Sequence, residues 1–424
     1  MKLETALERI YSMHQFNIKL GLHNIEKLMK HLGNPEKKIK AIHIAGSNGK
    51  GSTASFMSSI LQEAGYRIGL YTSPHLVKFN ERIRINSEMI PDFYIQNFIS
   101  EMDEYIRTES PTFFEITTAL AFKYFAENNI DYAVIETGLG GRLDATTVLN
   151  PIASVITTIS LEHTNILGDS LEQIAYEKAG IIKENINVFI GILPEIAGNV
   201  VINVANQLRC KTFELEKYIL ISKNSIKFVS DNFEMMLNEM PLKGNHQLLN
   251  AALSILTLKY TFTNISNKAI EEGIQSVVKN TGIQGRYEIV HNNPKVIFDA
   301  GHNVECTKTF INEFKKEYLR YSKRTLIFGA MKDKNVVSMI KSLVPFFDNI
   351  FVTNINYERA YAAGELKSKA ESNNIKVKVL NDSIKFIKEF LNNESSECLV
   401  VLGSIYLLGE IKSQLKYSLT INEK

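Results

Sequence analysis

A glycine-rich segment near the N-terminus has the residue types that bind phosphate. It runs from Gly46 to Thr53, between a predicted strand and a predicted helix. Glycines let backbone N–H groups wrap around phosphate oxygens, the helix N-terminus adds positive potential, and the Lys50 ammonium can reach the β- and γ-phosphates. The segment departs from the strict P-loop pattern because residue 44 is Ile and Gly51 follows the lysine. We predict a phosphate-binding loop here rather than a chance cluster of glycines.

Three polar side chains follow the ends of three predicted strands. They are Ser73, Glu136 and His163. In open parallel sheets, ligands collect outside the carboxyl ends of the strands, so these side chains can converge on the phosphate loop. A hydroxyl, a carboxylate and an imidazole can together hold a divalent ion that also binds ATP phosphates. The residues alone leave a structural alternative open for each: a cap for Ser73, a surface acid for Glu136 and a core histidine for His163.

The predicted elements that position these residues alternate between strands and helices. Short apolar runs rich in β-branched residues are typical of parallel strands covered by helices on both faces. A helix over 53–64 has a helical apolar period and ends at Gly65. In this part of the chain, strands are predicted over 41–45, 66–71, 132–135, 153–159 and 188–193. The alternation is that of βαβ units and predicts a mainly parallel sheet.

The pattern changes beyond residue 211. Alternating apolar residues on both sides of Ser230-Asp231-Asn232 predict an antiparallel hairpin, which we place at the edge of the sheet. Helices are predicted over 246–260 and 267–278, and the polar stretch 280–285 is predicted to be a linker. A second series of strands is predicted over 296–298, 325–328, 350–353, 377–380 and 398–402.

The predicted fold class is therefore α/β. A P-loop-containing, mainly parallel N-terminal ATPase domain is expected over 1–282, and a smaller Rossmann-like α/β C-terminal domain over 283–424.

Composition excludes several classes of protein. The 48 Lys and Arg residues nearly balance 46 Asp and Glu residues, so bulk charge gives no reason to expect a nucleic-acid or membrane partner. Three cysteines lie far apart without zinc-ligand spacing, which favours a reducing compartment and no structural zinc. The N-terminal segment carries Glu4 and Glu8 where a secretory signal needs an apolar run, and no apolar stretch is long enough to span a membrane. We expect a cytoplasmic protein.

The phosphate loop belongs to a series of motifs that resembles those of the folylpolyglutamate synthases and dihydrofolate synthases, which are members of the Mur ligase superfamily. The resemblance covers nearly the whole chain. The motifs are GSNGKGS over 46–52, TSPHL over 72–76, FNERI over 79–83, TFFE over 112–115, ETGLGGRLDA over 136–145, EKAGIIK over 177–183, GNHQ over 244–247 and DAGHN over 299–303.

The resemblance implies sites for ATP, magnesium and a folate. The residues that it implies contact the nucleotide are Asn48, Gly49, Lys50, Gly51, Ser52, Asn250, Arg286 and Asp299. Those that it implies bind magnesium are Ser73, Glu136 and His163. Those that match the segments lining the pterin side of the folate site are Thr112, Phe113, Phe114, Glu115, Leu143, Asp144 and Ala145.

Lys178 matches a lysine that is carbamylated in this family. A carbamate turns an ammonium into an anionic oxygen ligand, which suits a second magnesium ion; an ordinary lysine beside Glu177 is the alternative. His302 is a candidate for orienting glutamate, so the implied catalytic residues are Lys50, Lys178 and His302. The chain departs from the family pattern at Glu162, where Asp is usual, and in the turn after Asp299, where Pro is replaced by Val304.

The resemblance implies an ATP-dependent ligase. The carboxylate of a pteroate or folate attacks the γ-phosphorus, and L-glutamate displaces the resulting acyl phosphate, giving ADP and phosphate. The alternatives are a cell-wall amino-acid ligase of the same superfamily and a non-catalytic nucleotide-dependent binding module. The sequence does not separate addition of the first glutamate to dihydropteroate from extension of folate tails, and we expect a bifunctional enzyme because bacterial members often are. The expected partners are folate or dihydropteroate and L-glutamate, and the expected state is a monomer.

Overall fold

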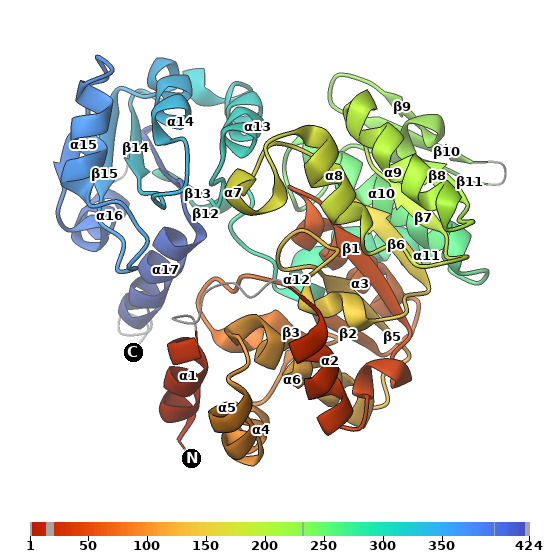
Figure 1. The fold of residues 1–424 in the computed structure, drawn as a ribbon. Helices are drawn as coiled ribbons and strands as arrows, with labels where there is room; N and C mark the ends of the chain where they lie inside the picture. The colour runs from red at the N-terminus through yellow and green to blue at the C-terminus, as the bar shows by residue number, and fades with distance from the viewer. Residues whose placement is uncertain (1, 14–20, 231–232, 394, 420–424) are drawn as a thin grey trace. The chain divides into compact units, whose positions relative to one another are not determined.

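The computed structural model describes residues 2–13, 21–230, 233–393 and 395–419 (Figure 1). The chain divides into two units. The first comprises Met1–His75, Phe79–Pro241 and Gln247–Gly282, and the second comprises Leu76–Lys78, Leu242–His246 and Ile283–Lys424. Within the ranges described, no helix is both long and apolar enough to cross a membrane.

The first unit is built on a sheet that has the order β4-β3-β2-β5-β1-β6-β7-β8 among the described residues. Strands β2, β5, β1, β6, β7 and β8 pair in parallel in that order. Strands β3 and β4 continue the sheet beyond β2 as an antiparallel edge. Their bounds are β1 Ala41–Ala45, β2 Ile68–Tyr71, β3 Ile83–Ile85, β4 Glu88–Met89, β5 Tyr132–Glu136, β6 Ala153–Ile156, β7 Val188–Ile190 and β8 Thr212–Glu214. The parallel strands are apolar and almost wholly buried, as expected for strands covered on both faces.

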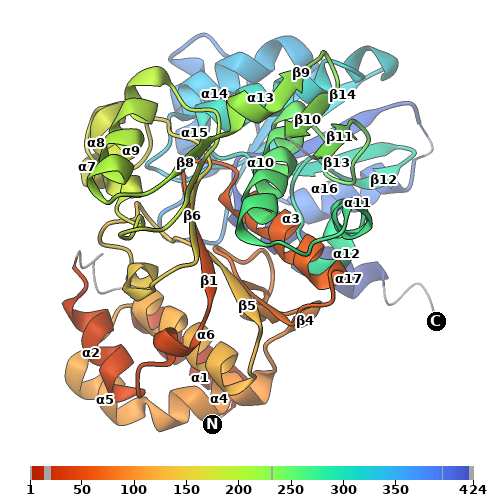
Figure 2. The same cartoon turned by 90° about the vertical axis from the view of Figure 1, so that its right-hand side faces the viewer.

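The helices of this region cover the sheet in groups. Figure 1 shows α8 next to α9, and Figure 2 shows α1 packed with α4 and α6. The helix bounds are α1 Leu3–Ser12, α2 His23–His31, α3 Lys50–Glu63, α4 Asp92–Glu101, α5 Asp103–Glu109, α6 Phe113–Glu127, α7 Thr164–Leu167, α8 Leu171–Ala179, α9 Glu195–Gln207, α10 Asn245–Thr261, α11 Asn267–Gln275 and α12 Val277–Thr281.

Helix α3, which follows the phosphate loop, is enclosed by its neighbours. Every residue from Ser52 to Leu61 is buried. Helix α11 approaches so closely that a side chain at Gly273 would overlap the backbone of Ile60. The Ser59 hydroxyl also donates to the Gly273 carbonyl oxygen at 2.6 Å. Close backbone approach and a hydrogen bond to α11 therefore hold the helix in place, in addition to apolar packing.

The predicted hairpin lies in a separate sheet, so its placement at the edge of the large sheet was wrong. Strands β9 Ile219–Ile221, β10 Ile226–Ser230 and β11 Phe233–Leu237 form an antiparallel sheet of order β11-β10-β9. Strand β10 pairs with β11 on one edge and with β9 on the other. That edge of β10 is therefore not available to pair with β8. Asp231 and Asn232 of the predicted turn lie outside the described residues.

The second unit is an α/β layer structure of its own. Its sheet has the order β12-β13-β17-β14-β15-β16 in the described part of the chain, and all neighbours are parallel except the β12–β13 pair. Neighbouring residues of β13, such as Ile297 and Phe298, enter two different apolar clusters, one on each face. The bounds are β12 Glu288–Asn292, β13 Lys295–Asp299, β14 Arg324–Phe328, β15 Asn349–Thr353, β16 Lys378–Leu380, β17 Cys398–Leu402, α13 Val304–Phe314, α14 Val336–Leu343, α15 Ala363–Glu371, α16 Ser383–Leu391 and α17 Ile405–Leu419.

The predicted linker over 280–285 was wrong at its first residues. Asn280 is buried near the end of α12, and its amide donates to Glu63 Oε1 at 2.7 Å and to Ser59 Oγ at 3.1 Å. The helix predicted over 267–278 is two helices, α11 and α12, separated at Ser276. Helix α3 begins at Lys50 and not at residue 53, so the lysine lies in its first turn.

Candidate active site

The phosphate loop depends on two glycines with positive φ. Gly46 has φ of 153° and Gly49, the N-cap of α3, has φ of 85°. A side chain at Gly46 would overlap the Thr157 hydroxyl, and one at Gly49 would lie 2.6 Å from Asn250 Oδ1. Only glycine meets both requirements, the backbone conformation and the close approach. The loop also lies at the carboxyl end of β1, which is where ligands bind in parallel sheets.

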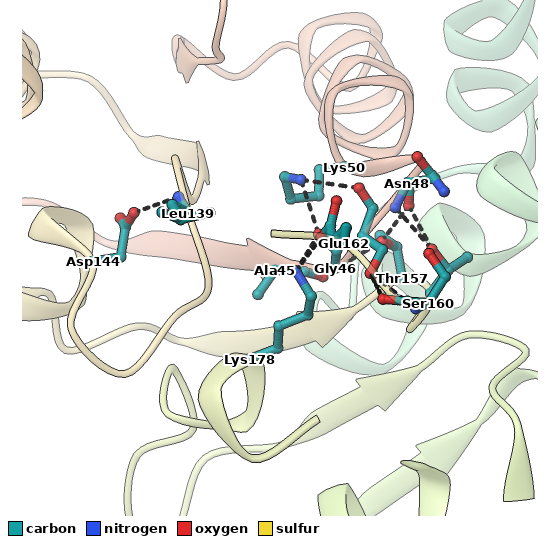
Figure 3. Close-up of polar contacts among 12 residues, drawn as sticks. Ala45, Gly46, Asn48, Lys50, Leu139, Asp144, Thr157, Ser160, Glu162 and Lys178 are labelled. Carbon is teal, nitrogen blue, oxygen red and sulfur yellow. Dashed lines mark hydrogen bonds and ion pairs between the residues drawn. The ribbon is translucent and has the colours of Figure 1, made fainter. Parts of the chain in front are cut away.

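Hydroxyl groups that follow β6 hold the phosphate loop in place. The Asn48 amide N–H donates to Thr158 Oγ1 at 2.9 Å, and the Asn48 carbonyl oxygen accepts from Thr157 Oγ1 at 2.7 Å. Ser47 Oγ donates to the Ser160 carbonyl oxygen at 3.2 Å and accepts from the Ser160 amide at 3.0 Å (Figure 3). The backbone N–H of Asn48 is therefore bonded to the scaffold.

Two lysines meet at one carbonyl oxygen of the loop. Lys50 Nζ donates to the Gly46 carbonyl at 2.8 Å, and Lys178 Nζ donates to the same oxygen at 2.9 Å (Figure 3). Lys178 Nζ also lies 2.7 Å from Glu162 Oε1. Lys178 is 1% exposed, so this is a buried ion pair beside the phosphate loop.

The electrostatics of this pair favour both charged forms at neutral pH. Burial lowers the pKa of Lys178 to about 8, against the attraction of Glu162. Burial alone would raise the pKa of Glu162, but the ammonium groups of Lys178 and Lys50 lower it to about 2. The lowered pKa of Lys178 makes the neutral amine more accessible near pH 7 than it is for a surface lysine.

Two of the three predicted metal ligands are joined directly. The Ser73 amide donates to Glu136 Oε2 at 3.0 Å. Glu136 is buried at the end of β5, and a side chain at Gly51 would lie 3.4 Å from its Oε2, so the carboxylate faces the first turn of α3. His163 is exposed, has φ of 46°, and stands at the N-cap position of α7 on the segment that also carries Glu162.

The side-chain types at this position are ones that would suit a magnesium ion shared with phosphate. Thr137 Oγ1, next to Glu136, is buried and has no hydrogen-bond partner in the described parts of the chain. Among all the residues that the structure describes, no group of three or more His, Cys, Asp or Glu side chains is placed to hold a metal ion by itself. A hydroxyl, one carboxylate and phosphate oxygens are the ligands that magnesium takes when it binds with a nucleotide.

The Thr112–Glu115 segment begins α6 with a reciprocal capping box. The Thr112 amide donates to Glu115 Oε2 at 2.7 Å, and the Glu115 amide donates to Thr112 Oγ1 at 3.2 Å. Phe113 is buried and lies under the Arg82 guanidinium, 5.1 Å from its centre to the ring. Phe114 lies against Gly138, where a side chain would overlap its ring. The two polar residues of the segment thus shape the helix start, and the two aromatic rings lie against other parts of the fold.

Asp144 organises the segment from Gly138 to Thr146. Its Oδ2 accepts from the amides of Gly138 at 2.9 Å and Leu139 at 2.8 Å, and its Oδ1 accepts from the Thr146 amide at 3.0 Å and from the Thr146 hydroxyl (Figure 3 shows the bond to Leu139). Burial raises the pKa of Asp144, and these four donors oppose that effect. Leu143 and Ala145 flank this carboxylate in the chain.

The remaining predicted residues lie on separate units. Asn250 is buried on α10, where its amide donates to Gln247 Oε1 at 3.1 Å. In the second unit, the Asp299 carboxylate at the end of β13 accepts from the amides of Tyr287 and Gly301, both at 2.8 Å. His302 Nδ1 lies 3.1 Å from the Ala300 carbonyl oxygen, and Arg286 Nη1 donates to the Gly285 carbonyl oxygen at 3.1 Å. Burial raises the pKa of Asp299.

Sequence reasoning missed the groups that support the site. It identified Glu162 as a departure from a family pattern but not as the partner of Lys178. It also missed the hydroxyl run of Thr157, Thr158 and Ser160, for which the signal was a polar stretch directly after a buried strand. His43, in the middle of the apolar strand β1, gave a further signal that was not used.

Comparisons with known proteins match this architecture. Residues 44–258 match the Mur ligase middle domain, and residues 285–405 match the Mur ligase glutamate ligase domain. The chain is 37% identical to the dihydrofolate synthase/folylpolyglutamate synthase of Bacillus subtilis, over 97% of this chain and 99% of that protein.

Solved structures of similar proteins contain ligands that are relevant to the site. E. coli FolC in complex with DHPP and ADP is similar with a TM-score of 0.87 and 27% identity, covering 99% of this chain and 98% of that one. A bifunctional folylpolyglutamate synthase/dihydrofolate synthase with Mn, AMPPNP and L-glutamate bound is similar with a TM-score of 0.85 and 25% identity, covering 98% of each chain.

Proposed function

The chain belongs to the folylpolyglutamate synthase/dihydrofolate synthase family of the Mur ligases, and from that premise we propose how its residues act. The protein is an ATP-dependent, ADP-forming ligase that joins L-glutamate to folates. We propose further that it accepts both dihydropteroate and folates with a glutamyl tail. The relatives whose names include both activities support this bifunctional assignment.

The assignment of the site rests on one observation: the Glu136 carboxylate lies next to the phosphate loop. Glu136 bonds to the Ser73 amide and faces Gly51, so an ion held by this carboxylate would lie beside bound phosphate. We assign nucleotide phosphates to Asn48 through Ser52, and magnesium to Ser73, Glu136 and His163. Magnesium, when bound, neutralises charge on the phosphoryl oxygens during transfer. Lys50 shares that role once its ammonium leaves the Gly46 carbonyl for the phosphate.

Carbamylation of Lys178 is part of this proposal. The neutral amine attacks the carbon of CO2, a C–N bond forms as one C=O π bond gives its electrons to oxygen, and the nitrogen loses one proton to solvent. The burial that lowers the pKa of Lys178 to about 8 supplies neutral amine at physiological pH. The carbamate is an anionic ligand suited to a second magnesium ion. It cannot pair with Glu162 as the ammonium does, so Glu162 must then rely on a cation such as Lys50, whose charge already acts on it.

The substrates are assigned to the two units. We assign the pterin side of the folate to Thr112–Glu115 and Leu143–Ala145. Asn250, Arg286 and Asp299 are assigned to the nucleotide, and His302 is assigned to orienting glutamate. His302 Nδ1 lies 3.1 Å from the Ala300 carbonyl oxygen, a contact that fixes the orientation of the ring.

The reaction follows from these roles. The substrate carboxylate attacks the γ-phosphorus, the bond to the β-phosphate oxygen breaks, and ADP leaves an acyl phosphate. The amine of L-glutamate then attacks the activated carbonyl, phosphate leaves, and one proton is lost from the nitrogen. A carboxylate is a poor electrophile, so the phosphoryl group is what makes amide formation feasible. Lys50 contributes by stabilising the negative charge on the transferred group.

The test uses the purified full chain with ATP, magnesium and glutamate. Dihydropteroate and a tetrahydrofolate are offered separately, and the products are resolved by mass. A mass increase of one glutamyl residue with both acceptors, together with release of ADP, is expected. A product with only one acceptor overturns the bifunctional assignment. Product with a UDP-linked muramyl substrate instead would support a cell-wall ligase, and ATP binding without product from any of these acceptors would support a nucleotide-binding module.

A further inference from the structure

We propose that His43 is a positioning residue for the folate: through the Thr146 hydroxyl, it fixes the Asp144 carboxylate and the Gly138–Thr146 segment that we assign to the pterin. The inference rests on the proposed function, because it takes Leu143–Ala145 as the pterin side of the site. The inference adds His43 of strand β1, a residue to which the proposed function gives no role.

The three side chains form a continuous buried chain of hydrogen bonds. His43 Nε2 lies 2.8 Å from Thr146 Oγ1, and the Thr146 hydroxyl donates to Asp144 Oδ1. Asp144 in turn accepts from the amides of Gly138 and Leu139. His43 and Thr146 have no exposed surface, so water does not compete for these bonds.

The direction of the bonds determines the tautomer of His43. A hydroxyl has one proton, and that of Thr146 goes to the Asp144 carboxylate. Only a lone pair of Thr146 Oγ1 is left for His43, so His43 Nε2 must carry the hydrogen. Burial, and then the charge of Lys183, lower the pKa of His43 to about 3, so the ring is neutral and its Nδ1 has no proton. That Nδ1 is buried and has no partner among the residues described.

The unpaired buried Nδ1 means that packing alone does not favour histidine over an apolar residue at this position. An apolar side chain of similar size would fill the same space on β1 without a buried acceptor. What histidine adds is a rigid ring that donates from Nε2 and holds the Thr146 hydroxyl in the orientation that serves Asp144. His43 also lies three residues before Gly46, so the same strand supports the phosphate loop and the segment assigned to the pterin.

The first test measures the Michaelis constants of four variants. His43→Leu removes the donor, His43→Gln keeps an N–H near the position of Nε2, Thr146→Val removes the hydroxyl, and Ile42→Val is a packing control on the same strand. We expect His43→Leu to raise KM for the folate about tenfold, with KM for ATP changed less than twofold. His43→Gln is expected to recover most of this loss. Equal increases in both constants, or a similar folate effect from Ile42→Val, would overturn the proposal.

A double mutant tests whether His43 acts through Thr146. Because the effect of His43 passes through one hydroxyl, His43→Leu combined with Thr146→Val should bind folate no worse than Thr146→Val alone. Additive losses would show that His43 acts by another route and would overturn the proposal.

A measurement on the wild-type protein separates this inference from the ligase assignment. In the full chain labelled with nitrogen-15 histidine, the His43 signals are identified by their absence in His43→Gln. They should report a neutral ring protonated at Nε2 from pH 5 to pH 8. A ring protonated at Nδ1, or a charged ring, refutes the inference even if the ligase is active. The expected tautomer in a protein without ligase activity would leave the hydrogen-bond chain intact and refute the proposed function instead.

Discussion

The Lys178 ammonium lies 2.7 Å from Glu162 Oε1 and is almost completely buried. Because the same ammonium also donates to the Gly46 carbonyl oxygen, it connects the phosphate loop with the segment that carries His163. A change at either end of this pair therefore affects both the chemistry and the stability of the site.

Replacement of Lys178 is expected to remove activity in a way that a small acid can restore. Lys178→Ala should lose about 10²–10³-fold in kcat because the anionic ligand is missing. Added formate or acetate should recover part of the rate by entering the vacated space. Turnover assays with and without the acid measure this effect. An active wild-type protein with an unmodified lysine by intact mass, under CO2, would contradict carbamylation.

The Glu162 carboxylate should make a pH-dependent contribution to stability. Its pKa is lowered to about 2 in the folded protein, so its contribution is complete above the unfolded pKa of 4.5 and is lost as pH falls from 4.5 toward 2. In CO2-free buffer, where Lys178 stays an ammonium, denaturant unfolding of wild type and Glu162→Gln should differ by about 3 kcal/mol at pH 7. The difference should shrink toward zero near pH 2. A difference that is constant from pH 7 to pH 2.5 would refute the charge pairing.

Lys50 is expected to matter for turnover and not for folding. Among the residues described, its ammonium donates to the carbonyl oxygens of Gly46 and Ser47, so we expect its removal to cost little core packing. Lys50→Ala should lower kcat about 10²–10³-fold, with a change in unfolding free energy below about 1 kcal/mol. ADP release and a denaturant titration measure the two quantities. A folded variant with activity near wild type removes Lys50 from the mechanism.

The proposed metal ligands should be recognisable in a magnesium titration. Glu136→Gln keeps an oxygen acceptor for the Ser73 amide but removes the charge, and His163→Ala removes an exposed imidazole. Each should raise the magnesium concentration for half-maximal rate roughly 10–100-fold. Glu177→Gln, which changes a carboxylate that pairs with Arg142, is the matched control. Titration curves like wild type for both ligand variants would show that the metal assignment is wrong.

An acyl phosphate intermediate would transfer an oxygen atom from the substrate carboxylate to phosphate. If the substrate carboxylate attacks the γ-phosphorus, one of its oxygens must depart with phosphate when glutamate displaces it. With oxygen-18 in that carboxylate, the label should appear in inorganic phosphate, detected by mass, with ADP as the other product. Unlabelled phosphate, or AMP and pyrophosphate, would mean that the carboxylate is activated differently.

The sequence was informative where burial leaves a local pattern. The parallel strands β1, β5 and β17 are short runs of mostly apolar residues, and the phosphate loop has glycines at the positions where positive φ is needed. Strand β12 was missed because its residues are mostly exposed at an antiparallel edge. Asn280 was assigned to a linker because an amide is usually solvent-exposed, whereas here Ser59 and Glu63 provide partners in the interior.

The site was less predictable because its key contacts join distant positions. Glu162 and Lys178 are 16 residues apart, and His43 and Thr146 are 103 residues apart. Nothing local in either member of a pair specifies the other. Only the parallel sheet, which brings the ends of β1, β5 and β6 together, places these side chains within hydrogen-bond distance.

Because α3 is enclosed, the exchange of its amide hydrogens can report the stability of the first unit. The side chains from Ser52 to Leu61 are buried, and α11 packs so closely that a side chain at Gly273 would overlap the Ile60 backbone. In deuterium exchange, the middle of α3 should therefore exchange only when the whole unit unfolds. Its exchange rate would then convert directly into the global unfolding free energy, without any chemical denaturant. Ligands that stabilise this unit would be detected as slower exchange at Phe56 and Met57, which follow the phosphate-assigned residues along the same helix.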